Sequence, residues 1–435
     1  MISYQPVRKL NVSRRLATNK IISVGTLVKN SQAIYFQYNP EYLQSYSSLS
    51  PFKLNFYHSL QIASKHPHFG LHGLFDDSLP DGWGRLLMDR IFRQKGLMPQ
   101  QISPLDRLSY IGQHAMGALQ YSPAIEDSFT HMEHSIDLYQ LGTEAQNIFE
   151  GQASEVLTQL AYAGSSAGAR PKALIYTAGN LIDRVSTQEA PELTPWLIKF
   201  TSSSLSLGHE ESLCESTYLH MAQQAGINVP EWQLIPTHNS QQGKAWLALK
   251  RFDCTAEHGR LHMHTASGLL DADFRMPSLD YEDLIKASQM LCQSPSIGQE
   301  VFARMIFNLF SLNQDDHSKN WSFLQNDNGQ WHLSPFYDIT FSPNPHGEHT
   351  TALLGYGKKP PLKIIQKLAE QANFSNWKQA QLKIQEIVDS IQNWDHLALE
   401  QQIDQPTRTH IQKQINTVRK DNLSLFTPAN IKLKM

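Results

Sequence analysis

Cysteine is scarce in this sequence: three occur in 435 residues, and Cys214, Cys254 and Cys292 lie far apart. None of their spacings fits a metal site, so we expect reduced thiols in a cytoplasmic protein. Long apolar runs are also missing, and residues 1–20 carry charges in place of the apolar segment of a secretory signal. These absences argue against a disulfide-rich protein and against a membrane partner.

Net charge is small as well. The 37 Lys and Arg residues are intermixed with 40 Asp and Glu residues, which gives a net charge of −3 at pH 7. The sequence has no block of basic residues of the kind that binds nucleic acid, so we do not expect this chain alone to bind it. A hydrophobic content of 40% is typical of a globular protein. Because the chain is too long for one ordinary core, we expect three domains, at 1–135, 136–253 and 254–435.

Hydrophobic periodicity indicates the main elements. Alternation predicts a hairpin from 21–28 and 33–38, and helical spacing is found at 85–92, 138–161 and 214–225. In the last third of the chain the apolar stripes predict buried helix faces. Their members are Val301, Met305, Leu309 and Leu312, then Leu382, Ile387, Val388, Ile391 and Trp394, and finally Ile411, Ile415 and Val418.

One octapeptide, Asn313-Gln314-Asp315-Asp316-His317-Ser318-Lys319-Asn320, is too polar for a core. Burying these groups unpaired would be costly, so the turn either lies open or performs chemistry. Asp315 and Asn320 are five residues apart, as in the D-x-x-x-x-N catalytic loop of protein kinases. Asp338 follows in an apolar, strand-like run, 336–339, where a kinase has its second metal-binding Asp. This spacing favours chemistry, with Asp315 and not Asp316 in the kinase position.

A second pattern lies upstream. The segment from Gly164 to Lys172 consists mostly of small residues, and the apolar run 173–176 after it predicts a strand. Small side chains let backbone N–H groups approach a phosphate closely. The segment is not a Walker A loop, because the G-K-[ST] ending is absent, and by itself it is also compatible with an ordinary turn.

Lys199 interrupts the next apolar run, 196–200. It is either an edge-strand lysine directed at solvent or the strand lysine that binds nucleotide phosphates. Glu215, near the start of the next predicted helix, either matches the helix dipole or orients Lys199. Predicted strands at 232–235 and 246–250 then lead into residues 251–253. This order matches the N-lobe and hinge of a kinase.

Two further clusters have simpler explanations. Asp76, Asp77 and Asp81 lie in or before a Pro/Gly turn, where Asp usually caps a helix or makes an Asx-turn. His258 and His262 are four residues apart, but Gly259 and the lack of an apolar stripe argue against a metal-binding helix. His264, His346 and His349 add no recognised ligand spacing.

Together, these motifs resemble the HipA family, the serine/threonine kinase toxins of bacterial HipBA-type toxin–antitoxin modules. Residues 75–81 are similar to a signature of the family's N-terminal "couple" domain, continued at 110–118. Residues 165–172 are similar to its phosphate loop, Ser-x-x-Gly-x-x-x-Lys. Residues 313–320 and 336–339 are similar to its catalytic and metal-binding motifs. The resemblance covers nearly the whole chain.

The resemblance implies a role for each matching residue. Asp315 accepts the proton of the substrate hydroxyl, Asn320 and Asp338 hold Mg²⁺, and Glu215 is the partner of the strand lysine. Autophosphorylation falls on Ser165 or Ser166, and the choice between them stays open. The residues implied in nucleotide binding are Ala167, Gly168, Ala169, Arg170, Pro171, Lys172, Lys199, Lys250, Arg251, Phe252, His317, Lys319 and Tyr337.

Two positions depart from the family's pattern. Lys250 stands where an acidic residue is expected, although a hinge contacts adenine mostly through its backbone. Asp316 replaces a small residue beside Asp315 and is either a second carboxylate near the metal or a solvated one.

The implied fold is α+β: a two-lobed, protein-kinase-like fold with a β-rich N-terminal subdomain and a mostly helical C-terminal lobe. The implied activity is ATP- and Mg²⁺-dependent phosphorylation of a protein, in this family an aminoacyl-tRNA synthetase, by the toxin of a type II module. A HipB-like antitoxin is the implied partner and would make most of the DNA contact. Two alternatives stay open: a catalytically silent ATP- or partner-binding module, and a metal-dependent nuclease.

Overall fold

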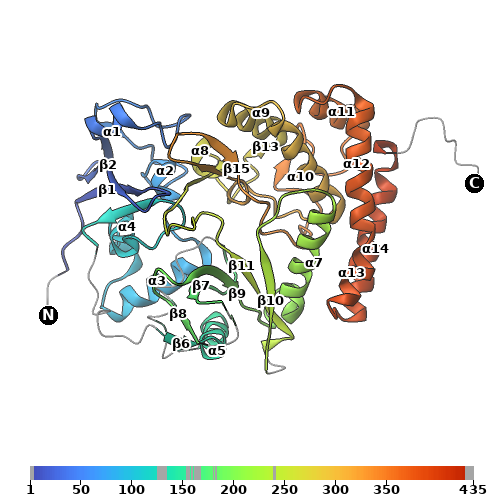
Figure 1. Cartoon of the computed structure of the whole chain (residues 1–435), viewed down its shortest axis with the longest axis horizontal. Coiled ribbons are helices and arrows are strands. Elements are labelled where there is room, and N and C mark those ends of the chain that lie inside the picture. The colour runs from blue at the N-terminus through green and yellow to red at the C-terminus, as the bar shows by residue number, and fades with distance from the viewer. Residues whose placement is uncertain are drawn as a thin grey trace, which may run out of the picture. The chain divides into compact units, whose positions relative to one another are not determined.

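The computed structural model describes residues 4–124, 135–152, 157, 160, 168–179, 181, 184–238 and 242–426. The chain forms two compact units (Figure 1). Unit 1 comprises Met1–His209, Glu231–Asp271 and Ser322–Gln330. Unit 2 comprises Glu210–Pro230, Ala272–Trp321 and Trp331–Met435. Both units therefore combine segments that are distant in the sequence.

Unit 1 begins with an antiparallel sheet in the order β4-β3-β2-β1-β5. Residues Leu27 and Phe36 pair across the predicted hairpin, and both are buried because alternate side chains of each strand face the core. That core also takes apolar side chains from α1 (Pro40–Ser45), α2 (Gly73–Asp76) and α4 (Pro104–Ile111). The strands are β1 (Lys9–Arg15), β2 (Ile21–Lys29), β3 (Ile34–Tyr38), β4 (Gln61–Ile62) and β5 (Leu119–Ser122).

A second sheet of unit 1 has the order β10-β11-β9-β7-β8-β6, so β9 is a central strand. Trp83 of α3 (Gly82–Gln94) and Leu141 of α5 (Leu138–Phe149) share one apolar cluster with side chains of β7, β9 and β11. The strands are β6 (Ser135–Asp137), β7 (Lys172–Thr177), β8 (Arg184–Ser186), β9 (Thr194–Lys199), β10 (Trp232–Pro236) and β11 (Ala245–Lys250).

The antiparallel pair β12 (His262–Thr265) and β14 (Ser322–Gln325), with α8 (Ala266–Leu270), also belongs to unit 1. Asp77 accepts hydrogen bonds from the N–H and Oγ1 of Thr265, both at 2.7 Å, and lies 2.5 Å from His264 Nδ1. His68 Nδ1 lies 2.8 Å from Asp76 Oδ2. These acidic residues therefore join the elements of unit 1. Across the described residues, no three His, Cys, Asp or Glu side chains gather as a metal site.

Unit 2 is mostly helical. Residues Val301 to Ser311 of α10 (Ile297–Ser311) are buried without interruption, because this helix is apolar on nearly every side and lies among other helices. It contacts α9 (Tyr281–Cys292), α12 (Trp377–Gln392) and α14 (Gln405–Asp421). The other elements are α7 (Glu211–Gln224), α11 (Leu362–Gln371), α13 (Trp394–Glu400), β13 (Leu279–Asp280), β15 (Trp331–Leu333) and β16 (Thr351–Ala352).

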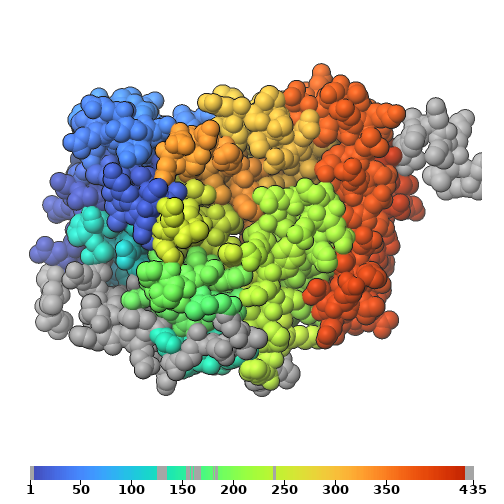
Figure 2. Space-filling model, in the orientation of Figure 1, coloured from blue at the N-terminus to red at the C-terminus, as the bar shows by residue number. Residues whose placement is uncertain are grey.

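In the space-filling view the red residues of α12, α13 and α14 form one continuous surface of unit 2 (Figure 2). Ile387, Val388 and Ile391 of α12 are buried beneath it, as their spacing predicts. The prediction that Leu382 shares this face is wrong, because its side chain is 57% exposed. The five-residue step from Leu382 to Ile387 turns about 140° around the helix, so the two side chains point in different directions.

The predicted α+β class is confirmed, with a strand-rich N-terminal region and a helical C-terminal region. The predicted strand around Asp338 is wrong: β15 ends at Leu333, and Asp338 has φ +57°, which no strand accommodates. None of the three cysteines forms a disulfide. Among the helices of the described residues, none combines the length and the apolar composition needed to cross a membrane. The division into three domains stays a prediction.

Candidate active site

The polar octapeptide begins where α10 ends, in unit 2. Leu312 closes the helix in the left-handed conformation, with φ +58°. The N–H of Asn313 then donates to Asn308 O at 3.1 Å, and Asn313 Nδ2 donates to Asn308 Oδ1 at 2.8 Å. The loop is therefore fixed at its start to the last turn of a buried helix.

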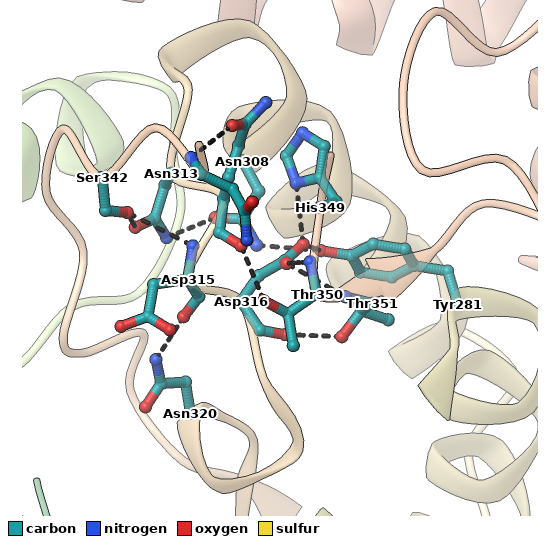
Figure 3. A network of polar contacts seen from close by, with 12 residues as sticks. Tyr281, Asn308, Asn313, Asp315, Asp316, Asn320, Ser342, His349, Thr350 and Thr351 are labelled. Carbon is teal, nitrogen blue, oxygen red and sulfur yellow. Dashed lines mark hydrogen bonds and ion pairs between the residues drawn. The ribbon is translucent and has the colours of Figure 1, made fainter. Parts of the chain in front are cut away.

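Asp316 anchors the loop from inside (Figure 3). Its Oδ1 accepts hydrogen bonds from the N–H groups of Thr350, at 2.8 Å, and Thr351, at 3.1 Å. Its Oδ2 accepts from Tyr281 Oη at 2.6 Å and from His349 Nδ1 at 2.9 Å. Burial and the adjacent Asp316 carboxylate raise the pKa of Tyr281 well above its ordinary value, which keeps the phenol a hydrogen-bond donor.

Both sequence-based interpretations of Asp316 need correction. The residue is 1% exposed, so it is not a solvated carboxylate. Each of its oxygens already accepts two hydrogen bonds, which leaves the metal interpretation without support. The physical reason is that a buried carboxylate needs several donors, and the segment from His349 to Thr351 supplies three of them.

Asp315 has the opposite environment. Its side chain is 63% exposed, while its backbone is held on both sides. The N–H donates to Ser342 Oγ at 3.3 Å, and the C=O accepts from Asn320 Nδ2 at 2.7 Å (Figure 3). His317 Nε2 lies 3.9 Å from Asp315 Oδ1. The structure thus brings three predicted site residues together around an outward carboxylate on a fixed backbone.

Three more predicted residues lie at the end of this loop and after β15. Tyr337 Oη donates to Lys319 O at 2.8 Å, and Lys319 Nζ lies 4.4 Å from the centre of the Phe274 ring, a cation–π distance. Asp338 follows Tyr337 in the left-handed conformation noted above. Non-glycine residues keep such a conformation where their surroundings enforce it, often at functional sites.

The predicted phosphate-binding lysines belong to unit 1. Lys199 lies on central strand β9 and is 6% exposed, so the interpretation as an edge-strand lysine in solvent is wrong. Its cross-strand partner on β7 is Lys172, which is 3% exposed. Directly opposed residues of antiparallel strands share a face, and like charges there repel. The pairing therefore places two lysine side chains on one buried face of the sheet.

The described part of the phosphate-loop candidate is Gly168 to Lys172. Gly168 has φ +108°, and a Cβ at that position would collide with Lys172 Nζ. The backbone conformation favours glycine at this position, and any side chain there would also displace the lysine ammonium group. Ser165, Ser166 and Ala167 lie outside the described residues.

At the predicted hinge, two backbone N–H groups already donate hydrogen bonds to other backbone groups of the protein. The N–H of Lys250 donates to Glu231 O at 2.9 Å, and that of Arg251 donates to Pro195 O at 3.1 Å. These two groups are not available to adenine. The Arg251 guanidinium binds Asp253, with Nη2 to Oδ2 at 2.6 Å, and this contact holds the pKa of the buried Asp253 carboxyl below its usual value although burial alone would raise it.

Glu215 lies in the second turn of α7 and is 1% exposed. It belongs to unit 2, whereas Lys199 belongs to unit 1, and the proposed pairing of the two stays a prediction.

The residues predicted to hold Mg²⁺ have suitable chemistry. Mg²⁺ prefers oxygen ligands and is usually held by one or two protein groups together with substrate phosphates and water. Asn320 Nδ2 is committed to Asp315 O, which turns the amide oxygen to the other side (Figure 3). Asp338 offers a carboxylate. The donor set fits a magnesium ion that the nucleotide helps to bind.

Comparison with known proteins places the chain in a family. A model described as "HipA-like C-terminal domain" matches residues 164–395, and one described as "HipA N-terminal domain" matches residues 18–122. The first match alone covers more than half of the chain. The protein belongs to the HipA family, as the sequence motifs predict.

Two solved structures were compared with the chain. The chain is similar to HipA of Shewanella oneidensis MR-1, in a complex with HipB and operator DNA, with a TM-score of 0.69 and 16% identity over 95% of this chain and 97% of that one. The proinflammatory kinase CtkA of Helicobacter pylori aligns with a TM-score of 0.38 and 14% identity over 53% of this chain and 86% of CtkA. The first comparison shows that the fold is that of HipA.

Sequence reasoning missed the residues that support the loop. Tyr281, His349, Thr350 and Thr351 hold Asp316 but come from segments about 35 residues away on either side. The only signal in the sequence was the second Asp beside Asp315, which shows that a carboxylate is present but not which way it points.

Proposed function

We propose that the protein is a serine/threonine kinase of the HipA type, which transfers the γ-phosphoryl group of Mg-ATP to a protein hydroxyl. The observation that carries the proposal is the contrast within one loop of unit 2. Asp316 is buried and bound by four donors, so that its neighbour Asp315 is presented outward on a rigid backbone. A catalytic base needs this combination of fixed position and access.

In the proposed reaction Asp315 accepts the proton of the substrate hydroxyl, whose oxygen forms a bond to the γ-phosphorus. The bond from that phosphorus to the β–γ bridging oxygen breaks, and ADP leaves. Asn320 and Asp338 would hold Mg²⁺, which neutralises charge on the phosphates when bound. Lys172 and Lys199, buried opposite each other, support a role in binding the phosphates. Catalysis of this kind rests on alignment and charge stabilisation.

The biological role follows from the family. We propose that the chain is the toxin of a type II module, acts in the cytoplasm, phosphorylates an aminoacyl-tRNA synthetase and autophosphorylates on Ser165 or Ser166. A HipB-like antitoxin that contacts the DNA is the proposed partner. Support comes from the relative in Shewanella oneidensis, which is in a complex with HipB and operator DNA.

The test is intact-mass analysis and phosphosite mapping after incubation with Mg-ATP, alone and with a panel of aminoacyl-tRNA synthetases. We expect phosphorylation by the native protein, none by Asp315→Asn, and normal levels in Asp283→Asn, which changes an exposed carboxylate of α9. ATP binding without any transfer would indicate the silent module. Nucleic-acid cleavage that needs Asp315 but no ATP would indicate the nuclease.

A further inference from the structure

The start of α3 lies directly against the phosphate-loop candidate within unit 1. Gly168 is bound through both of its backbone groups: its N–H donates to Asp81 Oδ1, and its C=O accepts from the Trp83 N–H at 3.0 Å. The indole Nε1 of Trp83 donates to Lys172 O at 2.8 Å. Asp81 and Trp83 therefore hold both ends of the segment from Gly168 to Lys172.

Polar groups at the start of α3 make hydrogen bonds to the loop and not within the helix. Asp81 occupies the N-cap position, where an Asp side chain normally accepts a hydrogen bond from the first turn, but it makes no such bond. Its carboxylate accepts from the N–H of Gly168 instead. The N–H of Trp83 is one of the donors that a first helical turn cannot satisfy internally, and the loop supplies its acceptor.

The two backbones approach so closely that glycine is needed. A Cβ at Gly82 would lie 2.6 Å from Ala169 Cα and 2.8 Å from Gly168 O, and Gly82 has φ +35°. On the other side of the loop, Lys172 Nζ lies against Gly168. A displacement of the loop away from α3 would therefore also displace the ammonium group that shares a sheet face with Lys199.

We propose that Asp81, Gly82 and Trp83 are positioning residues for the phosphate loop, so that the N-terminal region of the chain sets the affinity for nucleotide phosphates. These residues do not touch the nucleotide in this proposal. They act by keeping the segment in the place where the N–H groups of Ala169 and Arg170 and the Lys172 ammonium group can bind phosphate oxygens. The identity of the ligand rests on the proposed kinase function, whereas the hold of α3 on the loop does not.

The first experiment compares full-length Asp81→Ala with the native protein by hydrogen–deuterium exchange at the amides of Gly168 to Lys172, without nucleotide. We expect exchange to be faster by about tenfold, because a hydrogen bond to a charged acceptor is lost, and the Kd for Mg-ATP to rise by a similar factor. Asp137→Ala is the matched control. Asp137 caps α5 and accepts from the Gln140 N–H at 2.9 Å, so the substitution removes a helix cap but no hydrogen bond to the loop.

Trp83→Phe gives a second, conservative variant that keeps an aromatic ring in the core and removes the indole donor together with some buried ring volume. It should show the same two effects, and Asp81→Asn should restore part of both, because its amide oxygen can still accept. Native rates of loop exchange in Asp81→Ala and Trp83→Phe would overturn the proposal, as would faster exchange with an unchanged Kd for Mg-ATP. Faster exchange in a protein that neither binds ATP nor transfers phosphate would support the positioning role and refute the kinase.

Discussion

Asp315 and Asp316 are adjacent residues of the same type, but their side chains differ in exposure and in hydrogen bonding. One side chain is 63% exposed, and the other is enclosed by donors from α9 and from the segment that leads into β16. A buried carboxylate that is hydrogen-bonded on both oxygens stabilises the fold, whereas an exposed one can be reached by a substrate. Asp316 therefore has a structural role, and the role proposed for its neighbour Asp315 is chemical.

Single substitutions of Asp315 and Asp316 should affect different properties, the rate of phosphoryl transfer and the stability of the fold. Asp315→Asn should lower the rate of phosphoryl transfer by at least about a hundredfold, as loss of a general base does, with an unfolding free energy close to the native value. Asp316→Asn should lower the unfolding free energy by about 1–3 kcal/mol, because its amide NH₂ would face donors. Urea unfolding and phosphorylation rates measure the two effects. Loss of transfer in Asp316→Asn with native stability, and retained transfer in Asp315→Asn, would contradict this assignment.

Lys199→Met tests the buried lysine pair. The change removes one of the two ammonium groups on the shared sheet face but keeps much of the side-chain volume. We expect the Kd for Mg-ATP, measured by isothermal titration calorimetry, to rise by at least about tenfold, the effect of losing a charged hydrogen bond. Lys9→Met, on the exposed side of β1, should leave that Kd unchanged. A native Kd in Lys199→Met would remove this lysine from the phosphate site.

At the scale of elements, the loop depends on how α10 ends. Asn308 accepts from Asn313 Nδ2 at 2.8 Å and donates to Tyr281 Oη at 3.0 Å, so its one side chain joins α10, the loop and α9. The same Tyr281 also donates to Asp316. The start and the interior of the loop are thus connected through one amide and one phenol.

Asn308→Ala should therefore affect stability and chemistry together. Two buried hydrogen bonds are lost, which costs about 1–3 kcal/mol of unfolding free energy, and the transfer rate should fall because the loop loses its fixed start. The Kd for Mg-ATP should stay near the native value. Thr417→Ala, on the exposed part of α14, serves as the control for both measurements. A reduced stability with a native transfer rate would show that the end of α10 does not position Asp315.

Elements with a strong local pattern were predictable from the sequence. The hairpin of β2 and β3 follows from alternation, the strands β7 and β9 follow from short apolar runs, and α10 follows from helical spacing, each within a short window. The apolar neighbours of Asp338 predict a strand, but the residue has φ +57°, a left-handed conformation that a short window of apolar residues does not indicate. The same limit explains why the partners of Asp316, and the hold of α3 on the phosphate loop, emerged only with the structure.

At the scale of the whole molecule, matches to the N-terminal and C-terminal models of one family extend over residues 18–122 and 164–395. The two compact units do not follow these limits, since unit 1 takes in residues from both matched regions. The N-terminal region is thus part of the same compact unit as Lys172 and Lys199. In the proposed kinase, contacts far from the 313–320 loop in sequence, such as those of Asp81, would therefore affect nucleotide binding.

Stability of unit 1 should depend on pH through a buried histidine. His68 lies between two carboxylates, with Nδ1 2.8 Å from Asp76 and Nε2 3.3 Å from Asp271. Burial alone would lower the pKa of His68, but the close contacts with the Asp271 and Asp76 carboxylates outweigh it and raise the pKa to about 9. Because the folded-state pKa exceeds the ordinary value, the charged histidine stabilises the fold fully below about pH 6.5, and this contribution is lost as the pH rises through about 9.

The comparison of native protein with His68→Gln across pH 6 to 10 measures this contribution. At pH 6 the variant should be less stable by up to about 3 kcal/mol, since each unit of pKa shift corresponds to about 1.4 kcal/mol. Above pH 9 the two unfolding curves should converge, because the native histidine is then neutral and no longer pairs with the carboxylates. His396→Gln, on an exposed turn of α13, should show no such convergence. A stability difference that is constant from pH 6 to 10 would mean that His68 acts through packing and that its charge contributes nothing.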